Sequence, residues 1–224
     1  MDQGEVMSEQ TGAEPNRLER RKARTRSALV SAAQSFLAAG KPNVPILEIT
    51  QAADVGMGSF YNHFESREDL FRAAIEEALD RHGSTLDVLT EGMDDPAHIF
   101  AQSFRLTGRL HRRNPTLSKV LLNHGLALVS STKGLAPRAR RDIDAAVRAG
   151  RFQVRDVELA MTIVAGASLC LGQLLHDNPE RDDAAAADEV TEDLLRMFGI
   201  PPDEAREICE RPLPPIGAVP DNAA

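Results

Sequence analysis

The sequence predicts an all-α protein in which a small basic N-terminal three-helix unit precedes a larger helical bundle. Three observations support this prediction. Apolar residues recur at helical spacing, as Leu29, Ala33 and Phe36 do in one stretch. Glycines and prolines separate such stretches where helices begin and end. No stretch alternates apolar and β-branched residues with a period of two, so strands are not expected.

The N-terminal part is predicted to form a polar tail followed by four helices. The tail, residues 1–16, is expected to be disordered. Pro45 suits the first turn of a short helix, and Asp54 to Gly56 are expected to form a tight turn. Ser66 to Asp69 form a capping-box pattern that opens a longer helix. The helices are expected at about 17–39, 45–53, 57–64 and 67–89.

The rest of the chain is also predicted to be helical. Asp95-Pro96, Asn114-Pro115 and Asp156 mark three helix starts, and Gly199 followed by prolines marks a helix end. These signals place helices at about 96–113, 115–130, 137–147, 156–176, 182–198 and 203–210. The last residues form a proline-rich tail.

Composition excludes several classes of protein. The 224 residues are 42% hydrophobic and 27% charged, which is typical of a water-soluble globular chain. Cys170 and Cys209 are too few for a disulfide scaffold. They could form a single bridge, but free buried thiols in a reducing compartment are expected instead. The polar N-terminus does not resemble a signal peptide. The apolar run 159–175 is shorter than the roughly 20 residues of a membrane span, so we expect a buried helix, no membrane and a cytoplasmic location.

The charge of the chain is unevenly distributed. The formal net charge is −8, which taken alone argues against a nucleic-acid partner. Residues 15–66, however, carry seven bases and four acids. A basic segment in an acidic protein indicates one anion-binding face on a body that stays in solution.

Within this basic segment, two short helices separated by a tight turn are typical of a helix-turn-helix. The second helix of such a motif enters the DNA major groove. Here it begins with the small, uncharged run 56–59, which lets the backbone approach DNA closely. Tyr61, Asn62 and His63 follow, and each can hydrogen-bond a phosphate oxygen. Tyr61 is the single tyrosine of a chain without tryptophan, and its polar, basic surroundings favour a surface role.

Residues 24–75 resemble the N-terminal domain of the TetR family of transcriptional regulators. The resemblance rests on three stretches, ALVSAAQSFLAAG, ILEITQAADVGMGSFYNHF and ESREDLF. They follow the family's amphipathic first helix, its helix-turn-helix ending in Tyr-x-His-Phe, and its polar turn with a basic residue before a leucine. The remainder of the chain resembles the family in length and helical character.

The resemblance implies roles for individual residues. Phosphate contacts are implied for Thr25, Tyr61, His63, Arg67 and Arg24, with the basic run Arg20, Arg21, Lys22, Arg24 and Arg26 nearby. Base contacts are implied for Met57, Ser59 and Asn62, where Met57 would touch a thymine methyl group. Two residues depart from the family pattern. Asp54 replaces the usual turn glycine, and aspartate accepts the left-handed backbone of such a turn better than most residues. Gly56 replaces a Ser or Thr cap, and glycine is an acceptable N-cap residue.

The resemblance also implies a homodimer on a near-palindromic operator, with repression as the common behaviour and activation as the alternative. It divides the chain into a helix-turn-helix domain at 17–66 and a ligand-binding and dimerisation bundle at 67–210, between a tail at 1–16 and a tail at 211–224. An effector would release DNA by favouring a conformer whose reading helices are wrongly spaced.

Residues of the bundle can be proposed for both of its roles. The interface is expected on the last two long helices, with burial inside one subunit as the alternative; its candidates are Gly166, Ser168, Gly172, Val190, Leu194 and Phe198. A pocket for a small, mostly apolar effector is expected within the bundle, with plain core packing as the alternative for each residue. Its candidates are Phe100, Phe104, His111, Leu117, Leu121, His124 and Met161.

Two other classes of protein compete with a regulator. An enzyme is disfavoured because the sequence holds no H-E-x-x-H, C-x-x-C, G-x-S-x-G or phosphate-loop motif. For the same reason no metal or cofactor is expected. A helical scaffold that has lost DNA binding is disfavoured by the intact run 61–64 and by the basic segment before it.

Overall fold

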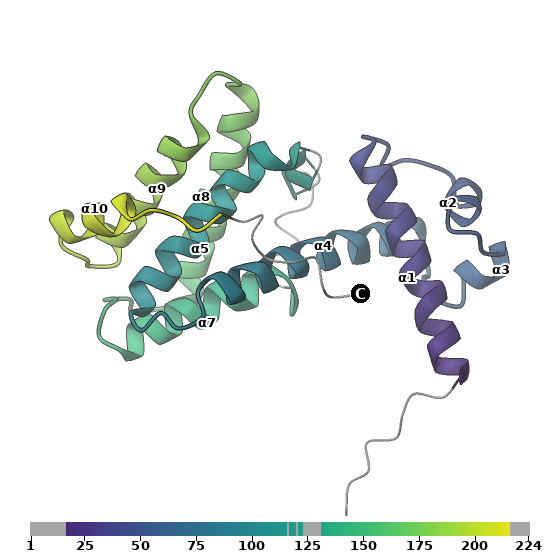
Figure 1. The fold of residues 1–224 in the computed structure, drawn as a ribbon, viewed down its shortest axis with the longest axis horizontal. Helices are drawn as coiled ribbons and strands as arrows, with labels where there is room; N and C mark the ends of the chain where they lie inside the picture. The colour runs from purple at the N-terminus through teal and green to yellow at the C-terminus, as the bar shows by residue number, and fades with distance from the viewer. Residues whose placement is uncertain (1–16, 116, 120, 123–130, 216–224) are drawn as a thin grey trace, which may run out of the picture.

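The computed structural model describes residues 17–115, 117–119, 121–122 and 131–215, and these residues form helices and no strand. The helices α1 (Arg17–Ala38), α2 (Ile46–Ala52) and α3 (Met57–Phe60) lie at one end of an elongated molecule (Figure 1). The bundle at the other end contains α5 (Pro96–Arg113), α7 (Leu135–Arg148), α8 (Val157–Asp177), α9 (Asp183–Met197) and α10 (Pro202–Glu210). The prediction of an all-α fold is confirmed.

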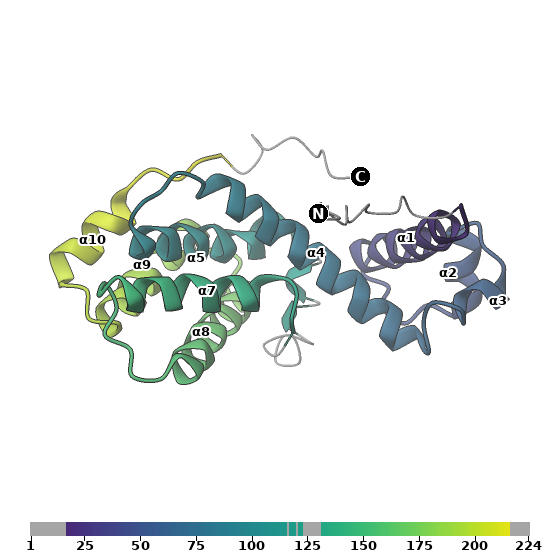
Figure 2. The same ribbon diagram turned by 90° about the horizontal axis from the view of Figure 1, so that it is seen from below.

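A single long helix, α4 (Arg67–Leu89), runs from the small unit into the bundle (Figure 2). Its start is the expected capping box. The Ser66 hydroxyl accepts a hydrogen bond from the Asp69 N–H at 3.1 Å, and the Asp69 carboxylate accepts one from the Glu65 N–H at 3.2 Å. These bonds satisfy two backbone donors and fix where α4 begins.

The turn between α2 and α3 has the conformation expected at Asp54, whose φ is +53°. Aspartate accepts this left-handed backbone better than most side chains, so the turn forms without the usual glycine. The helix after the turn is shorter than expected. It ends at Phe60, and residues 61–63 continue as a turn in which the Phe60 carbonyl accepts from the N–H groups of His63 and Phe64.

The small unit has its own core, and α4 contributes to it. Leu29, Ile49, Phe60 and Leu70 are completely buried there, and the α4 residues of this core extend to Leu79. The expected domain boundary at residue 66 precedes α4, whereas the first half of α4 packs with the small unit. This core therefore continues along α4 towards the bundle, where Leu121 also belongs to it.

The bundle is arranged around α5, which packs against α7, α8, α9 and α10. A cluster of aromatic rings fills its centre: Phe152 and Phe198 lie 5.5 and 5.8 Å from Phe100 between ring centroids. Beside this cluster, the buried Arg105 side chain donates two hydrogen bonds to the Asp188 carboxylate, at 2.8 and 3.1 Å, and a third to the carbonyl of Arg211. Arg109 also pairs with Asp188 at 2.9 Å. This cluster of charges joins α5 to α9 and to the chain after α10.

The expectation that the apolar run 159–175 forms a buried helix is only partly met. One side of α8 is buried, but Leu159, Ile163 and Leu174 are exposed, Leu159 by 63%. Among the described residues, α8 is the one helix long and apolar enough to cross a membrane, and that alone is weak evidence for a membrane span. The other side of α8 is an exposed apolar surface, a pattern that marks interaction sites in proteins.

We predict that Asp188→Ala lowers the free energy of unfolding by about 3 kcal/mol, because it leaves the buried Arg105 guanidinium without its carboxylate. Urea denaturation followed by circular dichroism measures the change. The matched control is Asp193→Ala, which removes an exposed ion pair with Arg196 and should cost less than about 1 kcal/mol. Equal losses in the two variants would contradict this account of the Arg105 cluster.

Candidate nucleic-acid interface and ligand pocket

The first turn of α3 presents an open surface. Met57 and Gly58 are exposed, Ser59 is half-buried, and a side chain added at Gly58 would meet no atom within 4 Å. Gly56 precedes the helix in an extended conformation and offers no side-chain cap, as expected. The N–H groups at this helix start are therefore free of a capping side chain and can face an anion.

Two buried phenylalanines hold this surface in place. Phe60 is completely buried and Phe64 nearly so, and both belong to the core shared with α1 and α4. The exposed Tyr61 ring packs edge-on against Phe60, with centroids 5.2 Å apart. The Arg26 guanidinium lies over the Phe64 ring at 5.3 Å and pairs with Glu77 of α4. The anchors fix the backbone, so Tyr61 and Asn62 are held at the surface.

The electrostatics of this surface favour an anionic partner. Partial burial lowers the pKa of His63, and the positive charges of Lys22 and Arg26 lower it further. At neutral pH the imidazole is therefore neutral, so it would donate an N–H to a phosphate without carrying charge. The cations that lower its pKa show that α1 brings positive charge next to the turn after α3.

The other residues implied in phosphate contacts differ in their surroundings. Arg24 is exposed, whereas the Thr25 hydroxyl donates to the Arg21 carbonyl at 3.1 Å within α1. The Arg67 guanidinium donates to the neighbouring Glu68 carboxylate at 2.6 Å. Its other N–H groups are available to a phosphate, but Glu68 weakens the positive charge that Arg67 presents.

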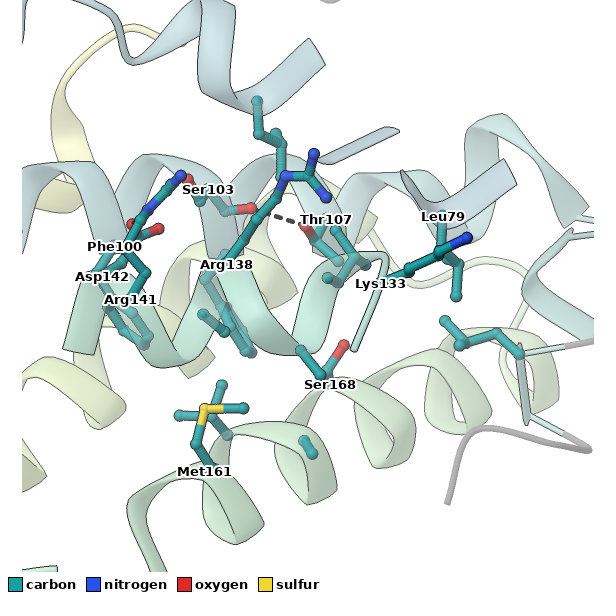
Figure 3. A pocket seen from close by; sticks show the side chains of 18 of the residues that line it. Leu79, Phe100, Ser103, Thr107, Lys133, Arg138, Arg141, Asp142, Met161 and Ser168 are labelled. Carbon is teal, nitrogen blue, oxygen red and sulfur yellow. Dashed lines mark hydrogen bonds and ion pairs between the residues drawn. The ribbon is translucent and has the colours of Figure 1, made fainter. Parts of the chain in front are cut away.

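A pocket of about 120 Å³ lies in the bundle between α4, α5, α7 and α8. Four of the residues expected to line a pocket surround it, namely Phe100, Phe104, Leu121 and Met161. Figure 3 shows Ser103 and Thr107 of α5 and Ser168 of α8 around the same space. The lining is therefore mostly apolar with a few hydroxyl groups.

One wall of the pocket is charged. Arg138 of α7 donates to Asp80 at 2.6 Å and to Asp87 at 2.8 Å, both on α4, and its side chain lies across Gly83. A methyl group at Gly83 would come within 2.7 Å of that side chain, so Arg138 would have to move from this position to accommodate it. Arg141 pairs with Asp87 and with the buried Asp142, each at 2.8 Å. Burial raises the pKa of Asp142, while Arg138 lowers that of Asp80.

Sequence analysis missed this charged wall. Arg138, Arg141 and Asp142 belong to the helix expected at 137–147, for which the sequence pattern gave no site residue. The periodicity of α7 does place Asp142 on the buried side of the helix, next to Ile143 and one turn before Ala146, which are both buried. An acidic residue on the buried side of a predicted helix was the sequence signal that could have indicated this charged wall.

Two residues expected in the pocket lie elsewhere. His111 is buried with its ring flat against Gly172 of α8, and its Nδ1 lies 2.7 Å from the Ser118 hydroxyl. Leu117 packs at the edge of the first core. Both side chains face neighbouring helices and not the pocket, because α5 and α8 approach each other closely at Gly172. His124 lies outside the described residues.

The residues expected at a dimer interface separate into two groups. Leu194 and Phe198 are buried in the core of this chain, Gly172 is covered by His111, and Ser168 lines the pocket. These four do not form a free surface, because the inner sides of α8 and α9 already pack against α5. Gly166 and Val190 are half-buried. The exposed apolar stripe of α8 overlaps the expected set at the half-buried Gly166, and its other residues, Leu159, Ile163, Cys170 and Leu174, are exposed.

Comparison with protein families identifies both parts of the chain. Residues 28–74 match "Bacterial regulatory proteins, tetR family", and residues 95–211 match "Tetracyclin repressor-like, C-terminal domain". The chain therefore belongs to the TetR family, which confirms the resemblance inferred from the sequence. It is a DNA-binding transcriptional regulator of a family without enzymatic activity. No curated protein matches the sequence.

Solved structures of TetR-family regulators share the whole fold. RolR in complex with resorcinol is 33% identical, with 88% of this chain and 98% of that chain covered at a TM-score of 0.67. RolR without ligand is 34% identical over 85% and 99% of the two chains, with the same TM-score. A putative regulator from Shewanella sp. PV-4 is 15% identical over 79% and 99%, with a TM-score of 0.61, and shows likeness of fold alone.

For the DNA surface, we predict that Tyr61→Phe weakens DNA binding roughly tenfold. The substitution removes one hydroxyl, and a hydrogen bond to a charged phosphate contributes about 1.5 kcal/mol or more. Fluorescence anisotropy with a mixed-sequence duplex measures the affinity. The ring still packs on Phe60, so the melting temperature should not change. Unchanged DNA affinity would show that the Tyr61 hydroxyl does not reach a phosphate.

Proposed function

We propose that this chain is a ligand-responsive repressor that binds a near-palindromic operator as a homodimer and releases it when a small single-ring compound enters the bundle pocket. The observation that carries this proposal is the path of α4. Its first half packs in the core that holds the helix-turn-helix, and its second half lines the pocket through Leu79, Leu86 and Asp87.

The contacts of α4 support a coupling between the two sites. At one end, Glu77 pairs with Arg26 of α1, and the Ala74 carbonyl accepts from the Gln34 side chain at 3.0 Å. At the other end, Arg138 holds Asp80 and Asp87. A compound that fits the pocket better with α4 shifted would move the reading helix with it, by no more than its preference for the shifted state allows.

The size and lining of the pocket favour a single aromatic ring with polar substituents. An engineered apolar cavity of about 150 Å³ binds benzene, and this pocket of about 120 Å³ is of similar size. Asp142 could accept a hydrogen bond from a ligand hydroxyl at the charged wall, and Ser103 or Ser168 could bond a second group elsewhere in the lining. RolR, one of the solved relatives, has a structure in complex with resorcinol, which is a compound of this class.

The exposed stripe of α8 supports the homodimer. Leu159, Ile163 and Leu174 lie along one side of the helix, with Gly166 and Cys170 between them. The exposed Met197 on α9 adds to the apolar surface of this last helix pair. A second copy of the same surface would cover the stripe, and twofold symmetry would then pair two reading helices on a near-palindrome. A dimer of this kind would act in the cytoplasm, where its DNA lies.

One experiment tests DNA selection and release together. The purified chain is incubated with sheared DNA of its source genome and eluted with rising salt, and the retained fragments are sequenced. We predict that a few fragments sharing a near-palindrome are retained, and that resorcinol, catechol or phenol releases them. Uniform retention that is lost at modest salt would overturn the proposed selectivity.

A pocket variant locates the site of release. Ala165→Leu fills part of the pocket and should raise the compound concentration needed for release at least tenfold. The matched control, Ala149→Leu, adds the same atoms at an exposed position and should behave as the unaltered chain does. Equal sensitivity of both variants would place the effector elsewhere, and no release by any of the three compounds would overturn the proposed ligand class.

We predict that Leu159→Glu with Ile163→Glu converts a dimer into a monomer, because two carboxylates would be buried unpaired in the interface. Light scattering should give twice the chain mass of 24.4 kDa for the unaltered protein and the single mass for the variant. Val88→Glu changes an exposed apolar residue on α4 and should leave the dimer intact. A variant that stays dimeric would show that the stripe is not the interface.

A further inference from the structure

The pocket of the bundle extends between the two large hydrophobic cores of the chain. At one end it is lined by Phe100, Phe104 and Met161, which belong to the core of the bundle. The other end is lined by four leucines that belong to the core of the small unit or pack against it, namely Leu79, Leu121, Leu135 and Leu169. We call these four residues the leucine end. Figure 3 shows Phe100 and Met161 on one side of the space and Leu79 on the other.

The two ends are farther apart than the width of one aromatic ring. The lining residues of α7 run from Leu135 to Asp142, and seven steps of an α-helix cover about 10 Å. Those of α8 run from Met161 to Leu169, which corresponds to about 12 Å. Aromatic rings in contact lie about 4.5–7 Å apart between centroids, so one ring takes up about half of this length. A ring placed at one end therefore leaves the other end unfilled.

The two ends differ in their chemistry. Asp142 lines the end near Phe100, where its carboxylate can accept a hydrogen bond from a ligand hydroxyl. The leucine end presents aliphatic side chains, of which Leu79 and Leu121 are buried. A polar ring therefore belongs beside Asp142, and an apolar substituent of that ring belongs among the leucines.

Charged side chains limit how far such a substituent can reach. Glu76 and Lys133 also line the pocket at the leucine end, the first half-buried and the second exposed. The start of α7 is tied to α4 there, because the Gly134 N–H donates to the Asp80 carboxylate at 3.3 Å. A chain long enough to cover Glu76 and Lys133 would remove water from their charges, which costs free energy. The leucine end thus suits a short alkyl group.

We propose that the leucine end is a second compartment of the effector site, and that it takes a short unbranched alkyl group carried by the effector ring opposite its hydroxyl group. This inference rests on the proposed function, since it places a single ring beside Asp142, and it narrows the ligand class to para-alkylphenols. An alkyl group in this compartment contacts Leu79 and Leu121, so the ligand touches the core that holds the helix-turn-helix.

The test measures the affinity of the unaltered protein for phenol, 4-ethylphenol, 4-propylphenol and 4-hexylphenol by isothermal titration calorimetry. Each methylene group that becomes buried should strengthen binding about fourfold. We expect the affinity to rise from phenol to 4-propylphenol and to fall for 4-hexylphenol, whose chain would reach Glu76 and Lys133. An affinity that stays constant along the series, or that is highest for the hexyl compound, would overturn the inference.

A variant locates the alkyl chain in the pocket. Leu169→Phe adds atoms at the leucine end and should lower the ratio of the 4-propylphenol affinity to the phenol affinity about tenfold, because overpacking leaves no room for the chain. Phenol itself should bind as before. The matched control is Leu18→Phe, the same substitution at a residue of α1 that is 71% exposed, and it should keep the ratio. An unchanged ratio in the Leu169→Phe variant would contradict the assignment.

The outcomes separate this inference from the proposed function. If phenol binds and releases DNA while the longer compounds gain nothing, the second compartment is overturned and the proposed function stands. If none of the four compounds binds, the ligand class of the proposed function is overturned, and the inference that rests on it falls as well.

Discussion

The ion pairs between Arg138 and helix α4 are the contact on which the functional parts of this protein depend. Arg138 lies across Gly83 and joins Asp80 and Asp87, one turn on either side of that glycine. The pairs hold α4 against α7 at the wall of the pocket. Because α4 is one continuous helix, they also set the direction in which its first half presents the helix-turn-helix. These ion pairs thus connect the pocket wall with the helix that packs against the helix-turn-helix.

The two ends of the molecule are stabilised by different kinds of contact. The small unit has a compact apolar core in which Phe60 and Phe64 fix a helix of four residues. The bundle combines an aromatic centre with buried charges, of which the Arg105–Asp188 pair is the clearest. Apolar packing suits a unit that must keep one shape on DNA. Charged and hydroxyl groups around the pocket give the bundle contacts that a ligand can exchange for its own.

The candidate sites were predictable to different degrees. Exposure of Tyr61 and Asn62 beside buried phenylalanines follows from a short local pattern, so the exposed residues that we expect to contact DNA could be named from the sequence. Pocket residues could be named only where they were large and apolar, as with Phe100 and Met161. Asp142 and Arg138 were missed because whether a charge faces solvent or another helix depends on which helix packs there. His111 was misplaced for the same reason.

The sequence by itself determined most of the helices and their caps, because these depend on contacts between residues near one another in the chain. It also indicated the family, because the helix-turn-helix motif is a short run of residue types. Asp54 in its turn and Ser66 at its cap are such local features. Only the tertiary structure decided which side of α8 is buried. Its residues are apolar almost all round, so periodicity could not separate the side facing α5 from the side with Leu159 and Ile163. That choice was made by the packing of α5, α7 and α9 against one side, and it left Leu159, Ile163 and Leu174 exposed on the other.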